Sequence, residues 1–194
     1  MGFTPMGAAA RGLRSPNGEQ LLRQTYDDNG IPKIPEGVVV VPQRVWPDDW
    51  GGSFKEAARF EDGVMQAPAL REQGVQHTVV QLNVSVITPR SRRFWHLHPT
   101  QSELWTISYG QLNAGLIDCR DGSPTFGLTA KVILTPERAL YIPTGVAHGF
   151  ANESTGVVVL QYMVNRQFSA TEQTEEWRLD PHEVPYDFVL GDVI

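Results

Sequence analysis

The motif that organises the chain reads Arg92-Arg93-Phe94-Trp95-His96-Leu97-His98-Pro99-Thr100-Gln101-Ser102-Glu103. A second motif, Pro143 to His148, supplies a third histidine after a Pro-x-Gly turn. His96 and His98 are two residues apart, so in an extended segment both side chains point to the same side of a sheet. Turns and strands separate the two motifs, and only a barrel or sandwich of strands would bring them together.

Short β-branched or alternating segments follow one another along the chain, with Gly, Pro and Asp turns between them. This rhythm is typical of antiparallel sandwiches and barrels. We therefore predict an all-β fold with a few short helices, one of them over residues 54–60. The predicted strands span residues 38–41, 78–88, 103–109, 112–119, 128–134, 139–142 and 157–164.

Composition narrows the class of protein further. The chain has 194 residues, 41% hydrophobic and 20% charged, a balance that allows one domain with a buried core. The net charge of −6 and the lack of a basic cluster argue against nucleic acid as a partner. Cys119 is the only cysteine and is predicted to be a packed strand residue. Because no segment has the character of a signal peptide or membrane span, we expect a cytoplasmic protein without a membrane partner.

The domain organisation is predicted to be simple. Residues 1–35 are rich in Gly, Pro and polar residues and have weak periodicity, so we expect an N-terminal arm that is mobile or wraps a partner subunit. Residues 36–194 are predicted to form a single domain.

Four side chains of the two motifs could converge on one point: His96, His98, Glu103 and His148. Imidazoles and a carboxylate are good ligands for a divalent first-row transition metal such as Fe, Mn, Ni, Zn or Co, and we predict a metal site. The alternative is a histidine–carboxylate hydrogen-bond network in a polar pocket. That network could still transfer protons, which makes His96 and His148 candidate catalytic residues. His77 and His182 lack such neighbours and are predicted to lie at the surface.

Polar residues alternate with apolar ones in the predicted strand over residues 78–88. Gln81, Asn83 and Ser85 share one face, which is either the solvent side of a two-sided sheet or the wall of a polar pocket. Arg93 precedes His96 and could hold an anionic group. Trp105, two residues after Glu103, is also assigned to the candidate substrate site.

Both motifs resemble those of the cupin superfamily. The first has the pattern His-x-His, Glu, Gly, with Gly110 in the last place, and the second has Pro-x-Gly, His, Asn, with Asn152 in the last place. From about Val38 to its end, the chain resembles the dTDP-4-dehydrorhamnose 3,5-epimerase (RmlC-like) family of cupins. The segments that carry this narrower resemblance are residues 42–48, 123–127 and 142–150.

The resemblance implies a jelly-roll β-barrel, a homodimer with exchanged N-terminal strands, and no metal. It also implies that Gln81, Asn83, Ser85 and Arg93 line the substrate pocket and that His96 is the general base. The chain departs from the family where Glu103 occupies the place of a lysine that stabilises the enolate. Phe168, which we assign to the substrate site, occupies the place of a catalytic tyrosine of the family. Further departures are Trp50 in place of a phosphate-binding arginine, Phe94 in place of a small glycine, and Asp187 or Asp192 as the partner of the base.

Three hypotheses follow for function. The first is an epimerase or isomerase acting on a keto-sugar, nucleotide-linked or free, or on a related carbonyl compound, with a metal in the place of the missing lysine. The second is a metal-dependent oxygenase that has kept the scaffold and changed its chemistry. The third is a binding module for a small molecule without catalysis.

Overall fold

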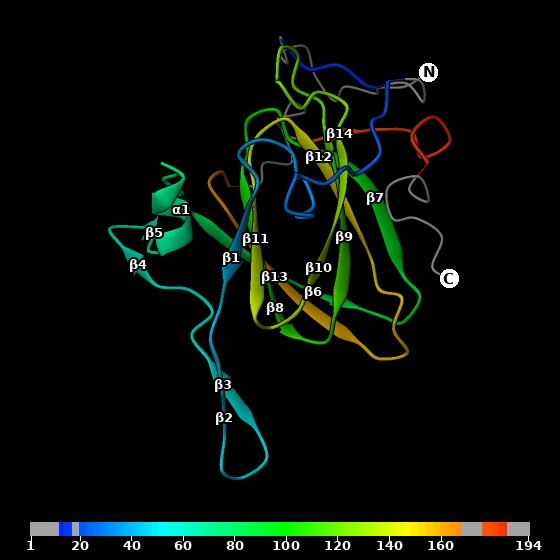
Figure 1. Cartoon of the computed structure of the whole chain (residues 1–194). Coiled ribbons are helices and arrows are strands. Elements are labelled where there is room, and N and C mark those ends of the chain that lie inside the picture. Colours follow the sequence, from blue (N-terminus) through cyan, green and yellow to red (C-terminus); the bar gives the residue numbers. More distant parts are fainter. Residues whose placement is uncertain (1–11, 17–19, 168–175, 186–194) are drawn as a thin grey trace.

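The computed structural model describes residues 12–16, 20–167 and 176–185, and its strands form two facing antiparallel sheets (Figure 1). Read across the first sheet, the strands are β1 (Val39–Pro42), β11 (Arg138–Ile142), β8 (Glu103–Tyr109), β13 (Val158–Val164) and β6 (Gln81–Ile87). Those of the second are β10 (Thr129–Leu134), β9 (Leu112–Asp118), β12 (Val146–Ala151), β7 (Arg92–Leu97) and β14 (Trp177–Arg178). This arrangement is a jelly-roll barrel, which confirms the predicted fold class.

The main core lies between the two sheets, where inward-facing residues of alternate strand positions meet. It contains Trp105, Leu112, Leu116, Leu140, Phe150 and Leu160, each at most 7% exposed. Because the outer faces of both sheets are also partly covered, several strands are apolar on both sides. The second cluster packs outside the second sheet around Trp95, Ile117, Cys119 and Trp177, and the third outside the first sheet around Leu70, Leu104 and Met163.

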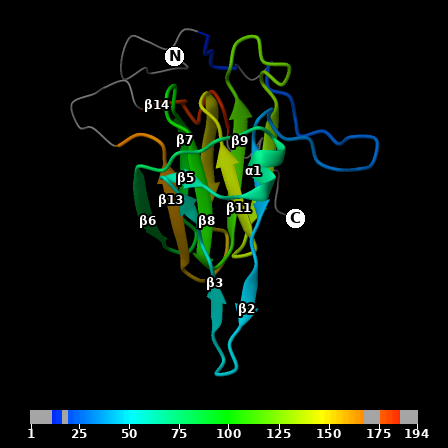
Figure 2. The ribbon, with the colours of Figure 1, turned by 90° about the vertical axis from the view of Figure 1, so that its left-hand side faces the viewer.

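A hairpin of β2 (Val45–Pro47) and β3 (Ser53–Lys55) projects from one end of the barrel (Figure 2). The predicted helix over residues 54–60 is therefore wrong. Phe54 pairs with Trp46 across the hairpin, with ring centroids 5.7 Å apart, and this cross-strand contact outweighs helical propensity. The short helix α1 (Pro68–Glu72) follows instead, after the pair β4 (Phe60–Glu61) and β5 (Val64–Met65).

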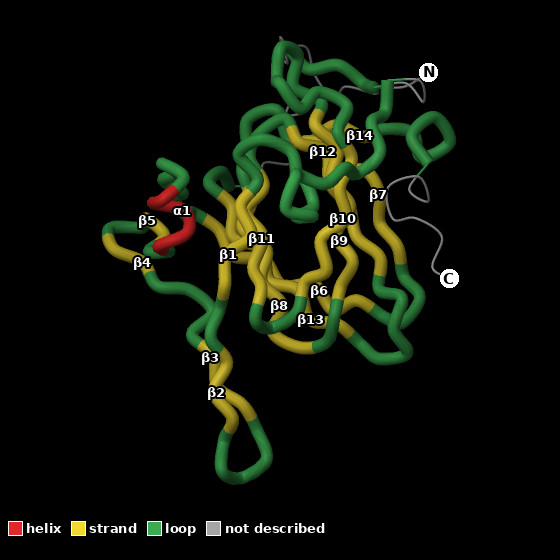
Figure 3. The backbone as a smooth tube through the Cα atoms, viewed as in Figure 1, coloured by secondary structure: helices red, strands yellow, loops and turns green. Residues whose placement is uncertain are grey.

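The described part of the predicted N-terminal arm lies along its own barrel as irregular chain (Figure 3). Leu13 bridges to Arg120, and Leu22 forms a bridge with Leu128. Leu21 is buried at 7% exposure within the second core cluster. Residues 12–16 and 20–35 thus pack against the barrel of their own chain. The predicted bounds of the domain, residues 36–194, stay a prediction. Within the described residues, no helix has the length and apolar character needed to span a membrane.

The predicted strands agree with the observed ones to within a few residues at each end. Three strands of the second sheet were not predicted as strands: β7, β12 and the two-residue β14. β12 contains Ala147, Gly149 and Ala151, small residues with low strand propensity, so its extended conformation depends on pairing with neighbours on both sides.

Candidate functional site

A β-bulge aims the first motif into the barrel. His148 of β12 pairs with His96 of β7, but Phe150 pairs with Arg93, so two residues of β7 oppose Gly149 alone. Arg93 and His96 are three positions apart and would point to opposite faces of a regular strand, yet both line one pocket. A Cβ atom at position 149 would overlap the Phe94 ring and lie 2.5 Å from the Arg93 carbonyl oxygen. The bulge therefore requires glycine at this position.

A glycine turn joins the two motifs. Gly145 donates its backbone N–H to the carbonyl oxygen of His98 over 2.9 Å. Its φ of +78° favours glycine, and a Cβ there would lie 2.5 Å from the Arg120 side chain. The turn that precedes β12 is thus tied directly to the segment after β7, which brings His148 beside His98, with ring centroids 5.4 Å apart.

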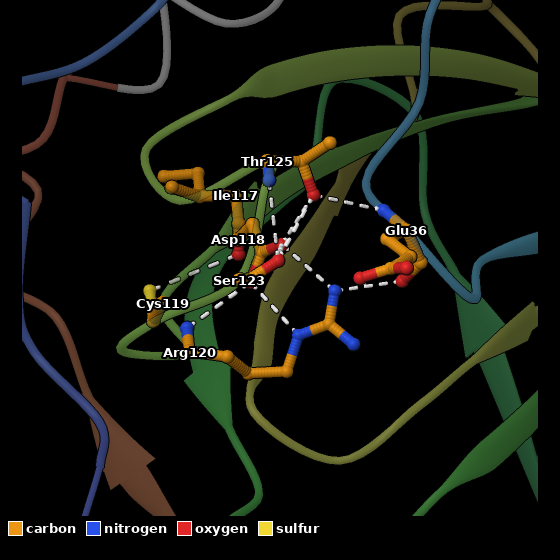
Figure 4. A network of polar contacts seen from close by, with 7 residues as sticks. All are labelled: Glu36, Ile117, Asp118, Cys119, Arg120, Ser123 and Thr125. Carbon is orange, nitrogen blue, oxygen red and sulfur yellow. Dashed lines mark hydrogen bonds and ion pairs between the residues drawn. The ribbon is translucent and has the colours of Figure 1, made fainter.

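A network of hydrogen bonds around the buried carboxylate of Asp118 holds the C-terminal end of β9 (Figure 4). Asp118 accepts bonds from Arg120 Nε (2.8 Å), Ser123 Oγ (2.6 Å) and Thr125 Oγ1 (2.5 Å). Burial opposes ionisation of Asp118, but these donors outweigh it and lower the pKa of the carboxyl group. Arg120 Nη2 also donates to the carbonyl oxygen of Glu36, and the N–H of Glu36 donates to Thr125 Oγ1. The network therefore anchors the chain before β1 next to the turn that presents His148.

His96 forms a pair with Glu176, a residue that the sequence did not single out. His96 Nδ1 lies 3.3 Å from Glu176 Oε2, and Arg178 Nη2 lies 2.5 Å from Glu176 Oε1. Burial opposes ionisation of Glu176, but the contact with His96 outweighs it and, with Arg178, lowers the carboxyl pKa to about 2. The buried His96 Nε2 has no hydrogen-bond partner among the described residues. One ring nitrogen is thus held by an anion, and the other is left for a ligand.

Glu103 lies at the centre of a second group, fully enclosed at one end of the pocket. Its Oε1 is 3.2 Å from His98 Nε2, and its Oε2 is 3.6 Å from His148 Nε2. Trp105 Nε1 donates to Oε2 over 2.6 Å, and Gln101 Nε2 donates to Oε1 over 2.8 Å. Burial opposes ionisation of Glu103, but the positive charge that the two histidines carry when protonated, together with the Trp105 N–H, outweighs it. The pKa of Glu103 is therefore held well below its usual range.

The tautomer of His148 makes this group suitable for a cation. His148 Nδ1 is 3.0 Å from the Val146 carbonyl oxygen, which can only accept, so Nδ1 carries the proton. Burial lowers the pKa of His148 to about 4, so the ring is neutral at pH 7 and its Nε2 has a lone pair. That lone pair faces the Glu103 carboxylate, and neither group has a proton to donate to the other.

The residues present fit a divalent metal. The ligand atoms of His98, Glu103 and His148 all lie within 4.8 Å of one another. Ligands bound at about 2.1 Å to one metal lie about 3.0–3.4 Å apart, close to the observed 3.2 and 3.6 Å. His96, His98 and Glu176 form a second such group. Among the described residues, the four predicted ligands thus divide between two groups that share His98, and His96 lies in the one nearer the pocket mouth.

The polar ladder of β6 faces the pocket. Gln81, Asn83 and Ser85 line a cavity of about 360 Å³, while Leu82 and Val84 on the opposite face are 55% and 58% exposed. Of the two alternatives for this strand, the structure shows the pocket wall. An apolar face in solvent and a polar face inside reverse the ordinary pattern of a surface strand.

The other predicted pocket residues are distributed as follows. Arg93 and Trp105 line the cavity, whereas Phe168, Asp187 and Asp192 lie outside the described residues. Polar pocket residues that were not assigned to the site from the sequence are Gln101, Tyr162, Glu176 and Arg178. Tyr162 follows the alternation of β13, opposite Asn83 and Trp105, so the strand period was a usable signal for it.

The prediction that His77 lies at the surface is wrong. His77 is 1% exposed and contacts Ser102 Oγ and the Met163 carbonyl oxygen, each at 3.1 Å. Its edge contacts Tyr141, with ring centroids 5.4 Å apart. The long-range partners that bury it come from β13, β11 and the loop before β8, none of which adjoins His77 in sequence. His182 is exposed, as predicted.

Comparison with known proteins places this chain in a family. The family model described as dTDP-4-dehydrorhamnose 3,5-epimerase matches residues 33–189. The Streptomyces griseus enzyme of that name is 30% identical over 152 residues, covering 75% of this chain and 71% of the relative. The Mycobacterium tuberculosis enzyme is 31% identical over 108 residues, so the match spans about half the length of each protein, 53% of both.

A solved structure supports the same assignment. The Bacillus anthracis dTDP-4-dehydrorhamnose 3,5-epimerase, determined with TDP and PPi bound, is 29% identical and superposes with a TM-score of 0.58. The superposition covers 70% of this chain and 76% of that one. With the match to the family model over most of its length, the chain belongs to the dTDP-4-dehydrorhamnose 3,5-epimerase family.

Proposed function

We propose that the protein is an epimerase or isomerase that acts on a keto-sugar, nucleotide-linked in its main substrate, or on a related carbonyl compound. The observation that carries this proposal is the His96–Glu176 pair in the pocket, with His96 Nε2 unpartnered among the described residues. Histidine titrates near neutral pH and is therefore suited to remove a proton from the carbon beside a carbonyl group. Membership of the epimerase family supports this chemistry.

The proposed reaction exchanges protons and needs no oxidant. His96 Nε2 takes the proton, the C–H electron pair forms the C=C bond of an enolate, and the carbonyl π electrons move to oxygen. A proton delivered to the opposite face of the carbon inverts the stereocentre. Tyr162 is our candidate donor, because its phenol-bearing side chain lines the pocket beside Asn83 and Trp105. Solvent then returns both residues to their starting protonation states.

Recognition of the substrate is assigned to the remaining polar lining. The amides of Gln81 and Asn83 and the hydroxyl of Ser85 offer donors and acceptors to sugar hydroxyls. Arg93 lies at the same wall with its guanidinium 5.8 Å from the Phe150 ring centroid, and we assign it to the diphosphate of the substrate. The nucleotide diphosphate held by the Bacillus anthracis relative supports this choice of substrate class.

We further propose that His98, Glu103 and His148 hold a divalent transition metal, with His96 at its edge. The resemblance to the family implies an enolate-stabilising lysine in the place of Glu103, so this chain would carry an anion where the family carries a cation. A bound metal would supply positive charge to the enolate oxygen. In this arrangement the chain's own residues separate the two tasks, since the triad binds the cation and His96 moves the proton.

The first experiment measures proton exchange. A dTDP-linked 4-keto sugar incubated in D₂O with the protein is expected to take up deuterium beside the carbonyl without oxygen consumption. Replacement of His96 with Asn should lower that rate by about 10²–10⁴-fold, the usual contribution of a general base. Absence of exchange with several nucleotide-linked and free keto-sugars would rule out the epimerase proposal.

The second experiment is metal analysis of the purified protein, and it also addresses a competing function. Stoichiometric metal that is lost in Glu103→Gln but kept in Glu61→Gln, the same change at an exposed carboxylate of β4, supports the triad. The same triad favours a metal-dependent oxygenase as the alternative function, because two histidines and a carboxylate leave positions open for other ligands. Oxygen uptake with a chelating substrate, and no deuterium exchange, would select the oxygenase. A metal-free protein that still exchanges deuterium would reject the metal and leave the epimerase.

We propose a homodimer as the functional assembly. The outer face of β6, an edge strand, carries Leu82, Val84 and Val86 at 55%, 58% and 67% exposure, and Tyr109 of β8 is 67% exposed. An uncovered apolar row on an edge strand is a usual site of association. Light scattering is expected to give a dimer mass that falls to the monomer mass in Leu82→Lys/Val84→Lys. A monomeric wild-type protein at micromolar concentration would exclude this assembly.

A further inference from the structure

His77 lies directly behind the Glu103 end of the pocket and takes no part in the chemistry described above. It is 1% exposed, and its neighbour Ser102 is 5% exposed. The two nitrogens of the ring join two separate elements: Nδ1 contacts Ser102 Oγ, and Nε2 contacts the carbonyl oxygen of Met163 in β13. Both nitrogens of the buried ring are thus satisfied, as buried polar groups usually are, and the ring ties the segment before β8 to β13.

The direction of both hydrogen bonds follows from the acceptor in β13. The Met163 carbonyl can only accept, so Nε2 of His77 carries the proton. Burial, the largest effect, lowers the pKa of His77, and the ring is neutral at pH 7. Its Nδ1 is therefore an acceptor, and the Ser102 hydroxyl donates to it over 3.1 Å. The hydroxyl proton of Ser102 is thus committed to the side of the chain away from the pocket.

The backbone of the same residue is fixed independently. The N–H of Ser102 donates to Asn165 Oδ1 over 2.8 Å, just beyond the end of β13. Side chains alternate along an extended segment, so a Ser102 side chain held at the rear directs Gln101 and Glu103 to the front. Both of these line the pocket, and Gln101 Nε2 donates to Glu103 Oε1.

We propose that His77 is a positioning residue for Glu103, acting through Ser102. His77 and Ser102 lock the rear of residues 101–103 to β13, so that the Glu103 carboxylate is held between His98, His148 and the Trp105 N–H. This inference builds on the proposed function, in which Glu103 is the central ligand, but the placement of Glu103 can be measured without metal or substrate.

The test uses the Trp105 indole as a reporter of Glu103. Its N–H bond to the carboxylate, at 2.6 Å, is short and charge-assisted, and it is expected to move that indole proton downfield in a ¹H–¹⁵N spectrum. The chain has five tryptophans, and Trp105→Phe assigns the signal. His77→Phe keeps the ring that packs on Tyr141 but removes both hydrogen bonds, while Ser102→Ala removes only the donor. Glu103→Gln gives the position of the signal without the carboxylate.

The expected result is an indole signal shifted toward the Glu103→Gln position in both His77→Phe and Ser102→Ala. Affinity for Co²⁺, measured with the metal alone against a chelator, should fall about tenfold, the lower end of the effects of outer-shell partners. The matched control is Thr129→Val, which deletes a hydroxyl bonded to the Leu22 carbonyl far from the pocket. It should lower thermal stability without moving the indole signal.

Unchanged Trp105 signals in both variants would overturn the proposal and leave His77 as a packing residue. Should His77→Phe fail to fold, Ser102→Ala decides the question alone. Shifted signals in a protein that neither binds Co²⁺ nor exchanges deuterium would retain the positioning role and reject the proposed function. The positioning role of His77 and the proposed function can therefore be refuted independently of each other.

Discussion

Replacement of Gly149 with alanine tests the bulge that builds the site. The added Cβ would overlap the Phe94 ring and lie 2.5 Å from the Arg93 carbonyl oxygen, so side-chain motion alone cannot make room. Overpacking costs about 1–3 kcal/mol, and we take the upper value because one neighbour is backbone. Alanine recovers up to about 1 kcal/mol by restricting the unfolded chain. The net loss is about 2 kcal/mol in the free energy of unfolding, or about 4–8 °C in melting temperature for a domain of this size.

Urea unfolding followed by tryptophan fluorescence measures this loss. Gly156→Ala is the matched control, because the nearest atom to its Cβ, Ser154 Oγ, is 4.0 Å away. That control is expected to change stability by less than about 0.5 kcal/mol. Phe94→Leu should restore only part of the stability of Gly149→Ala, since the Arg93 carbonyl remains. A Gly149→Ala protein as stable as the wild type, with unchanged Co²⁺ affinity, would refute the bulge as the element that sets His96 and His148.

Three further predictions concern other parts of the molecule. Glu176→Gln should lower the deuterium-exchange rate at least about tenfold, because His96 loses its anionic partner. The melting temperature should change little, because the pair lies at the partly exposed pocket mouth. Equal exchange rates in the two proteins would exclude Glu176 as the partner of the base. Asp118→Asn should cost about 2–3 kcal/mol in urea unfolding at pH 7. Because folding lowers the pKa of Asp118, its contribution is complete well above the ordinary value of 3.8 and is lost as the pH falls through the lowered one, so the two proteins should converge in acid. Lys55→Met removes an ammonium that donates to Gln43 Oε1, Thr106 Oγ1 and the Ile107 carbonyl. The β2–β3 hairpin should then become a site of rapid limited proteolysis. The control Lys33→Met should not change the digestion pattern.

The resemblance to the family implies a lysine where this chain has Glu103, and this is the main chemical difference from the family pattern that it implies. An anion at the carbonyl end of a pocket opposes the build-up of enolate charge, and a neutral His148 does not offset it. A cation bound between Glu103 and His148 would offset the carboxylate charge and stabilise the enolate, which is why the metal is proposed together with the function. Metal content and deuterium exchange, measured on the same preparation, separate the two halves of that proposal.

The residue pattern of single segments was sufficient to predict most strands of the barrel. Alternation and turn residues predicted β6, β8, β9, β10, β11 and β13 with small errors at their ends, because the strand pattern of each is visible in its own sequence. In β6 the apolar face is the exposed one, so the alternation predicted the strand but not which face lies inside. β12 was not predicted, since its small residues become strand-like only between β7 and β9. The helix over residues 54–60 failed for a similar reason, because the pairing of Phe54 with Trp46 is not encoded in a single segment.

The sequence by itself determined which residue types meet in the pocket: the spacing of His96, His98 and Glu103, and the turn before His148, are enough to predict a histidine–carboxylate cluster. Only the tertiary structure decided how those residues divide their roles. The bulge opposite Gly149 turns Arg93 and His96 to the same side, against the two-residue period of a strand. Glu176 comes from a distant segment and takes His96, while Val146 fixes the tautomer of His148. The pairing of His96 with Glu176 joins residues far apart in the chain and exists only after the barrel has closed. The contact of His148 with Val146 spans two residues, but it depends on the placement of the turn before β12, which is bonded to His98 of the other motif.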